Sequence, residues 1–65
     1  MVNIRRRKDT GKLFFDFKYM GVRCREYTIL EDTKANRKRM NSVAEKMNAE
    51  ITLGTFEYRR YFPNS

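Results

Sequence analysis

The fold is decided by one stretch of the chain, LFFDFKYMGVRCREY, residues 13–27. In its first half every second residue is apolar, as is typical of a strand with one buried face; these residues are Leu13, Phe15, Phe17 and Tyr19. Met20 and Gly21 follow as a two-residue turn, because glycine readily adopts the positive φ that tight hairpins need. The stretch therefore predicts an antiparallel hairpin of two strands, residues 13–19 and 22–29.

The turn also fixes the register, since side chains alternate across a sheet with a period of two. The predicted cross-strand pairs are Tyr19–Val22, Lys18–Arg23, Phe17–Cys24, Asp16–Arg25, Phe15–Glu26 and Phe14–Tyr27. One face is then apolar and is expected to join the core: Leu13, Phe15, Phe17, Val22 and Cys24. Glu26 falls on the same side, and we place it at the sheet margin, where its carboxylate reaches water.

A third strand is expected ahead of this hairpin. Residues 2–7 are short but able to pair, and the polar, glycine-containing segment 7–12 has the composition of a hairpin loop. If Ile4 faces inward, Arg6 does too and must extend past the sheet edge to reach solvent. The outward face then collects basic and aromatic side chains: Arg5, Arg7, Phe14, Lys18, Arg23, Arg25 and Tyr27. Asp16 also lies there, opposite Arg25, and is expected either to hold that arginine in one rotamer or only to offset its charge.

A single amphipathic helix follows the strands. Thr33 is the predicted N-cap and Gly54 the predicted stop. Between them apolar residues recur with helical spacing, at Met40, Val43, Ala44, Met47 and Ile51. This helix is the only predicted element able to cover the apolar sheet face. The expected fold is therefore α+β: a three-stranded antiparallel sheet with one C-terminal helix packed on one face, in the order β-β-β-α.

The expected domain organisation is simple. Residues 1–54 form one domain, and residues 55–65 form an aromatic tail that has neither strand nor helix period. The 65 residues carry 15 Lys and Arg against 8 Asp and Glu, a net charge of +7. Residues 1–30 hold eight cations and three carboxylates, a net +5, so the excess lies on the strands. Such an imbalance favours an anionic partner.

Several kinds of chemistry find no support in the sequence. The chain lacks histidine and has one cysteine, Cys24, which excludes an internal disulfide and a Cys/His metal site. We predict no catalytic residue, no metal, no cofactor and no small-molecule substrate, and Cys24 is expected to be a small buried hydrophobe. No apolar run approaches the roughly 20 residues that span a membrane, so no membrane partner is expected either.

The outward sheet face suits a nucleic-acid duplex. Cationic side chains neutralise phosphates, and guanidinium groups can read guanine edges in the major groove. The competing interpretation is a solvated basic face without a ligand, and the +5 imbalance favours binding. Phe14 and Tyr27 could contact thymine methyls or stack on bases, or they could form a cross-strand aromatic pair. The pair is favoured for Tyr27, and both alternatives stay open for Phe14.

Short motifs along the chain occur in a characteristic order: Ile4-Arg5-Arg6-Arg7, Leu13-Phe14-Phe15-Asp16-Phe17, Gly21-Val22-Arg23-Cys24-Arg25-Glu26, Leu53-Gly54-Thr55-Phe56-Glu57-Tyr58 and Tyr61-Phe62-Pro63. In these motifs the chain resembles the N-terminal arm-type DNA-binding domain of phage and prophage integrases, which are tyrosine recombinases. The resemblance covers nearly the whole chain.

The resemblance implies sequence-specific binding of double-stranded DNA at arm-type sites, with the sheet in the major groove, during integration or excision. The family's sheet positions correspond here to Arg5, Arg7, Lys18, Arg23 and Arg25, while Phe14 stands where the family often has a polar residue. It also implies a phage- or prophage-encoded protein of the bacterial cytoplasm. The catalytic domain of the parent recombinase would then be absent, and residues 55–65 would lead towards a linker.

Two other functions stay open. The aromatic tail, Phe56 to Phe62, could dock on other recombinase subunits, which would make the chain a protein-interaction module. Alternatively, the basic face could bind duplex RNA by shape.

Overall fold

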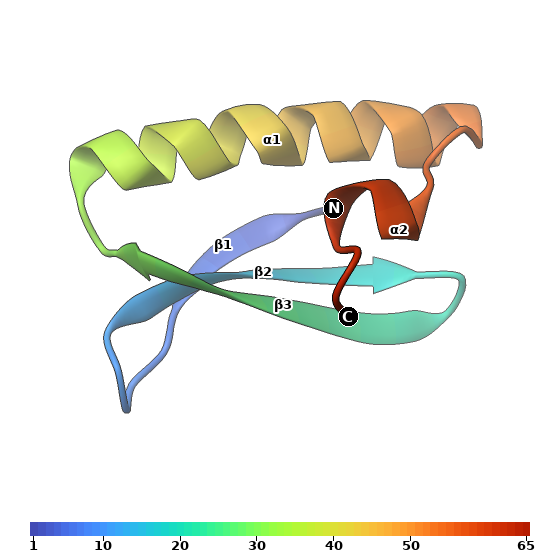
Figure 1. Ribbon diagram of the computed structural model, residues 1–65. Coiled ribbons are helices and arrows are strands. Elements are labelled where there is room, and N and C mark those ends of the chain that lie inside the picture. Colours follow the sequence, from blue (N-terminus) through green and yellow to red (C-terminus); the bar gives the residue numbers. More distant parts are fainter.

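The computed structural model describes all 65 residues, which form three strands and two helices (Figure 1). The strands are β1 (Asn3–Arg6), β2 (Lys12–Tyr19) and β3 (Val22–Glu31), and the helices are α1 (Lys34–Leu53) and α2 (Tyr58–Tyr61). The strands form one antiparallel sheet in the order β1-β2-β3, and α1 lies across one side of it (Figure 1). The predicted β-β-β-α fold is confirmed, with α2 as an additional element.

The β2–β3 hairpin has the register that its turn predicts. The six predicted pairs, from Tyr19–Val22 outward to Phe14–Tyr27, are all present. Met20 (φ 51°) and Gly21 (φ 78°) both have positive φ, as in a type I′ turn, whose twist matches that of the flanking strands. The two faces of the hairpin are therefore assigned as the alternation predicts.

β1 extends the same two faces. Ile4 packs against the core, and Arg5 faces the opposite side. Arg6 comes next on the core side, yet its side chain is 61% exposed and its Nε lies 4.0 Å from the carboxylate of Asp32. The predicted escape of Arg6 past the sheet edge is confirmed, since a long guanidinium side chain can leave an apolar layer in this way.

The ends of α1 lie where the sequence predicts them. The hydroxyl of Thr33 accepts a hydrogen bond from the Asn36 amide (3.1 Å), and Gly54 closes the helix in the left-handed region (φ 76°). The apolar stripe faces the sheet and buries Met40, Ala44 and Met47. Neither helix combines the length and the apolar character needed to cross a membrane.

The core lies between the sheet and its cover, and it contains eight buried residues: Val2, Leu13, Phe15, Phe17, Met40, Ala44, Met47 and Phe56. Burying an apolar side chain of Leu, Met or Phe size contributes roughly 1.5–3 kcal/mol, so this cluster supplies much of the stability. Two predicted core residues of the sheet differ from expectation, and on α1 the predicted stripe residue Val43 is 39% exposed. Val22 is 62% exposed, because it adjoins the turn on an edge strand, and Cys24 packs on the core but is only partly buried.

The cover of the sheet is shared, which corrects the expectation that one helix provides it. Phe56 is buried and packs edge-on against Tyr19, with ring centroids 4.9 Å apart. Tyr58 and Phe62 pack against Phe17 at centroid distances of 5.9 and 6.2 Å. Figure 1 shows α2 between the C-terminal half of α1 and the β2–β3 hairpin. The tail therefore belongs to the same core as the strands.

The tail also contacts Glu26, which lies at the sheet margin on edge strand β3, as predicted, and is partly exposed. The Tyr58 hydroxyl donates a hydrogen bond to its carboxylate, and the Ser65 hydroxyl donates another (2.8 Å). Burial and the neighbouring Glu26 carboxylate raise the pKa of Tyr58, so this phenol stays protonated and remains a donor. The tail thus satisfies a carboxylate that would otherwise lie against aromatic rings.

Candidate nucleic-acid interface

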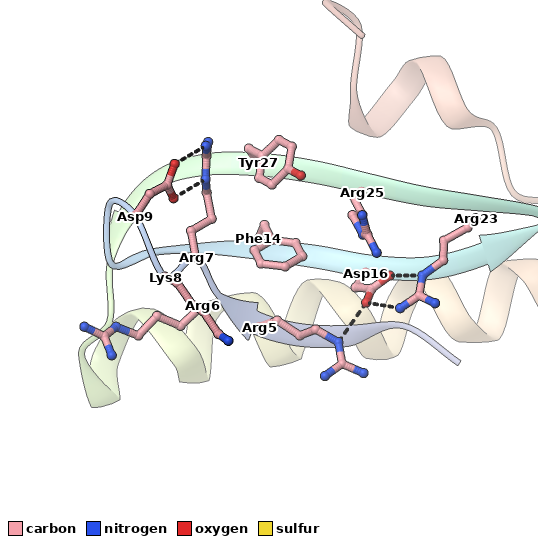
Figure 2. A pocket seen from close by; sticks show the side chains of 10 residues that line it. All are labelled: Arg5, Arg6, Arg7, Lys8, Asp9, Phe14, Asp16, Arg23, Arg25 and Tyr27. Atoms are coloured by element: carbon pink, nitrogen blue, oxygen red, sulfur yellow. Dashed lines mark hydrogen bonds and ion pairs between the residues drawn. The ribbon is translucent and has the colours of Figure 1, made fainter.

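The sheet face that points away from α1 holds an open groove of about 590 Å³ (Figure 2). Ten residues line it: Arg5, Arg6, Arg7, Lys8, Asp9, Phe14, Asp16, Arg23, Arg25 and Tyr27. Six of the seven residues predicted to bind DNA are among them. The seventh, Lys18, lines an adjoining hollow of about 410 Å³ that also includes Arg5, Asp16 and Arg23. The structure therefore brings the predicted set together on one surface.

Asp16 is the centre of this surface. It lies on the middle strand, β2, and is only 3% exposed, because arginine side chains from both neighbouring strands cover it. Arg5 on β1 donates from Nε to Oδ2 (2.7 Å). Arg23 on β3 donates from Nε to Oδ1 (3.1 Å) and from Nη2 to Oδ2 (2.9 Å). A buried carboxylate is tolerated only when it is paired in this way.

These bonds also set the charge state of the group. The hydrogen bond from Arg23 and the charges of Arg23 and Arg5 hold the pKa of the Asp16 carboxyl below its usual range, and they outweigh the opposing effect of burial. The same contact raises the pKa of Arg23. Asp16 is therefore ionised at neutral pH, and Arg23 keeps its full charge.

Of the two roles expected for Asp16 towards Arg25, holding that arginine in one rotamer is wrong, and offsetting its charge is the one that remains. Arg25 lies directly across the strand pair, as predicted, but Figure 2 shows no interaction between the two side chains. The carboxylate instead binds the two arginines on the diagonals, at the positions opposite Phe14 and Lys18. Diagonal neighbours lie within reach of long side chains, so register alone does not decide between them.

Arg25 is left without a protein partner. It is exposed, lines the groove, and makes no hydrogen bond or ion pair with the residues drawn in Figure 2. Lys18 is likewise exposed at the turn end of the same face. An exposed cation without a carboxylate partner remains free to bind an external anion, so these two side chains, like that of Lys8 in the loop, are uncommitted charges of the surface.

An aromatic cluster occupies the other end of the groove. The rings of Phe14 and Tyr27 form the cross-strand pair, with centroids 5.1 Å apart. The guanidinium of Arg7 lies over the Tyr27 ring, 4.5 Å from its centroid, and pairs with the carboxylate of Asp9 (2.8 and 3.1 Å). Because this cation–π contact and this ion pair hold Arg7, it is less free than Arg25. Tyr27 remains 54% exposed and available to a ligand.

The sequence did not indicate the whole surface. The sequence predicts Lys8 and Asp9 only as part of a loop, yet both line the groove beside the sheet. The spacing of Arg7 and Asp9, two positions apart in a tight loop, is the signal that could have identified their ion pair. Asp16 was placed on the correct face but with a different partner.

The electrostatics of the groove follow from its composition. Its lining contains six cations and only two carboxylates, both of which are already paired with arginines. A concave surface of one dominant sign concentrates ions of the opposite sign and speeds their association. The arrangement suits a polyanion that presents both phosphates and hydrogen-bond acceptors.

A protein-family model described as Arm DNA-binding domain matches residues 1–65, the strands, both helices and the tail included. Comparison with curated proteins and with solved structures gives no significant match.

Proposed function

The chain belongs to the Arm DNA-binding domain family, the N-terminal arm-type domain of integrases, and from this premise we propose that it binds double-stranded DNA at arm-type sites with its sheet in the major groove. The family is a DNA-binding one rather than a catalytic one. The observation that carries the proposal is the groove in Figure 2, which gathers six cations on the face opposite the helix cover.

The dimensions of the sheet support this mode of docking. Neighbouring strands lie about 4.8 Å apart, so three strands span roughly 10 Å between their outer backbones. The major groove of B-DNA is about 12 Å wide and admits β-structures. Arginine side chains that rise from the middle of the sheet can then reach base edges, while those near its ends meet the phosphate walls.

The positions of the side chains suggest a division of roles. Arg5, Arg23 and Arg25 lie around Asp16 in the middle of the face and are assigned to the base edges. Lys18 near the turn and Arg7 near the β1–β2 loop lie at opposite ends and are assigned to phosphates. Phe14 and Tyr27 are assigned to apolar contact with sugars or thymine methyls, in addition to stabilising the hairpin.

The biological setting is part of the same proposal. The domain acts within a tyrosine recombinase encoded by a phage or prophage in the bacterial cytoplasm, and it holds the recombinase on its attachment region during integration or excision. The family match supports the integrase context. The aromatic side chains within residues 55–65 pack on the sheet, and from there the segment would lead towards a core-binding region.

The aromatic tail suggested a protein-interaction module, but the structure gives these aromatic residues a role within the domain. The aromatic tail is used internally: Phe56 is 6% exposed, and the rings of Tyr58 and Phe62 pack against β2. No observation on the tail therefore favours a partner subunit over this internal role.

Chemical-shift mapping of the isotope-labelled domain with a DNA duplex tests the proposal. We expect the largest shifts on the groove face, at Arg5, Phe14, Lys18, Arg23, Arg25 and Tyr27. Lys38→Ala, which removes an exposed cation from α1, is the control and should leave affinity almost unchanged. Shifts confined to α1 and the tail would contradict the docking mode, and stronger binding of a duplex RNA competitor would contradict the choice of DNA.

A further inference from the structure

Asp16 is an unusual residue for a surface that binds anions. Its negative charge lies at the centre of the groove, and it is buried while the two arginines that cover it remain 54% and 61% exposed in their side chains. A carboxylate at this place weakens the attraction for phosphates. A surface that needed only affinity for DNA would gain from replacing it with a neutral residue.

The two arginines bind Asp16 in different ways. Arg23 uses Nε and one N–H of Nη2, the side of its guanidinium, so two bonds hold it while the N–H groups at its end stay free. Arg5 uses Nε alone, which leaves the end of its guanidinium, Nη1 and Nη2, without a protein acceptor. The pair of N–H groups at the end of a guanidinium matches the O6 and N7 atoms of guanine in a bidentate contact. Arg5 is thus anchored by one nitrogen and can present the other two to a base.

Anchoring has an energetic consequence for recognition. A free arginine loses side-chain entropy when a base fixes it, and it binds a phosphate at many angles with little preference for sequence. An arginine already held by a buried carboxylate has lost much of that freedom and presents its donors in one direction. Pre-organisation of this kind strengthens the matched contact relative to mismatched ones.

We infer that Asp16 is a positioning residue that gives the sheet its sequence discrimination, by fixing Arg5 for a bidentate guanine contact and Arg23 beside it, at the expense of total affinity for DNA. This inference rests on the proposed function and names the feature of the duplex that the face reads. Arg25, which has no carboxylate partner, supplies affinity without being fixed in this way.

The experiment compares Asp16→Asn with a matched control. Glu31→Gln likewise removes one carboxylate, but this one lies on β3, has a single ion pair with Lys12 (2.7 Å) and does not line the groove. A pool of DNA duplexes with a random 16-base-pair centre is first enriched on the wild-type domain. Dissociation constants are then measured at one salt concentration for the enriched duplex and for a shuffled duplex of the same composition.

In the wild type the enriched duplex should contain a guanine whose replacement by 7-deazaguanine, which lacks the N7 acceptor, weakens binding. For Asp16→Asn we expect the ratio of the two dissociation constants to fall at least about fivefold, the loss of one bidentate contact, while affinity for the shuffled duplex does not fall. Glu31→Gln should keep the wild-type ratio. An unchanged ratio in Asp16→Asn would overturn the inference and leave the proposed function standing.

A measurement without DNA separates positioning from charge. The Nε–H signals of Arg5 and Arg23 should be protected from exchange in the wild type and lost in Asp16→Asn, with the amide spectrum of the core retained. If Asp16→Asn does not fold, Arg5→Lys tests the inference instead, because it keeps the positive charge and removes the guanidinium group that Asp16 holds. Full discrimination between the two duplexes in that variant would overturn the inference. A wild-type domain that binds no duplex would refute the proposed function itself, and the inference with it.

Discussion

The side chains on the two faces of β2 are buried by different interactions, although they alternate along a single strand. On one side Leu13, Phe15 and Phe17 are almost completely buried beneath α1 and the aromatic tail. On the other side Asp16 is buried just as deeply, but by the side chains of charged residues that themselves face solvent. Apolar packing excludes water from the first face, whereas directed hydrogen bonds cover the carboxylate on the second.

The difference shows how a domain of 65 residues can both fold and keep a face free for a ligand. Apolar burial is roughly proportional to area and has no direction, so the core face can supply stability with little constraint on exact geometry. Charge-assisted hydrogen bonds contribute less net stability but fix orientation. Stability and recognition should therefore respond separately to mutation.

The largest expected effect comes from the core face. Phe17→Ala removes a ring that contacts Phe56, Tyr58 and Phe62, and we expect a loss of about 3–5 kcal/mol in the free energy of unfolding. The neighbouring Lys18→Ala, one residue further on the opposite face, should change this free energy by less than about 0.5 kcal/mol. Chemical denaturation measures both, and equal losses would mean that the two faces are not energetically distinct.

The next largest effect concerns the ligand face alone. Arg25→Ala should weaken binding to a specific duplex by about 1–3 kcal/mol if the side chain reads a base. Because Arg25 has no protein partner, the melting temperature should stay at the wild-type value. Fluorescence anisotropy and a thermal melt together test this. A lowered melting temperature would show that the face also contributes to folding.

A smaller effect is expected where the tail meets the sheet. Tyr58→Phe removes the hydroxyl that donates to Glu26, and we expect a loss of about 1–2 kcal/mol in stability with DNA affinity unchanged. Tyr27→Phe is the matched control for stability, since the Tyr27 ring is 54% exposed and packs against Phe14 without use of its hydroxyl. If both variants are equally stable, the hydrogen bond from Tyr58 to Glu26 contributes nothing to the stability of the fold.

The smallest effect is the dependence of stability on pH. The pKa of Asp16 is lowered in the folded state, so its contribution is present above the unfolded value, about 3.9, and is lost as pH falls through the folded value. Because its partners are half exposed, solvent screening keeps this contribution small. The difference in stability between wild type and Asp16→Asn should therefore shrink as the pH falls below about 4. Asp9, Glu31 and Asp32, whose pKa values are also lowered, titrate in both proteins and cancel.

Much of the fold could be predicted because local signals determine it. The period-two alternation and the glycine turn gave the six pairs of the β2–β3 hairpin, and Thr33 and Gly54 marked the ends of α1. The position of Arg6 also followed from register and side-chain length. These features depend on residues that are close in sequence, where spacing and backbone preference carry the information.

The parts that were not predicted depend on contacts between distant residues. The tail lacks periodicity, and its four-residue helix is placed by the rings of β2 and by Glu50 of α1, which accepts a hydrogen bond from the Tyr61 hydroxyl (2.8 Å). Glu26 finds its donors 32 and 39 residues away. On the ligand face, register correctly placed Asp16 opposite Arg25, but the reach of the side chains selected the diagonal partners. Alternation identifies a face, whereas the hydrogen bonds within it depend on three-dimensional packing.

The β2–β3 turn has a consequence for engineering. Met20 is the only non-glycine residue with positive φ, and its side chain is 84% exposed, so no packing offsets the strain of that backbone. A left-handed conformation costs an ordinary residue about 1–2 kcal/mol, and asparagine is the residue that type I′ turns prefer at this position. Met20→Asn should raise the free energy of unfolding by about 1 kcal/mol in chemical denaturation. This substitution could therefore offset the stability lost when the arginines of the sheet are altered to retarget the domain to new DNA sequences.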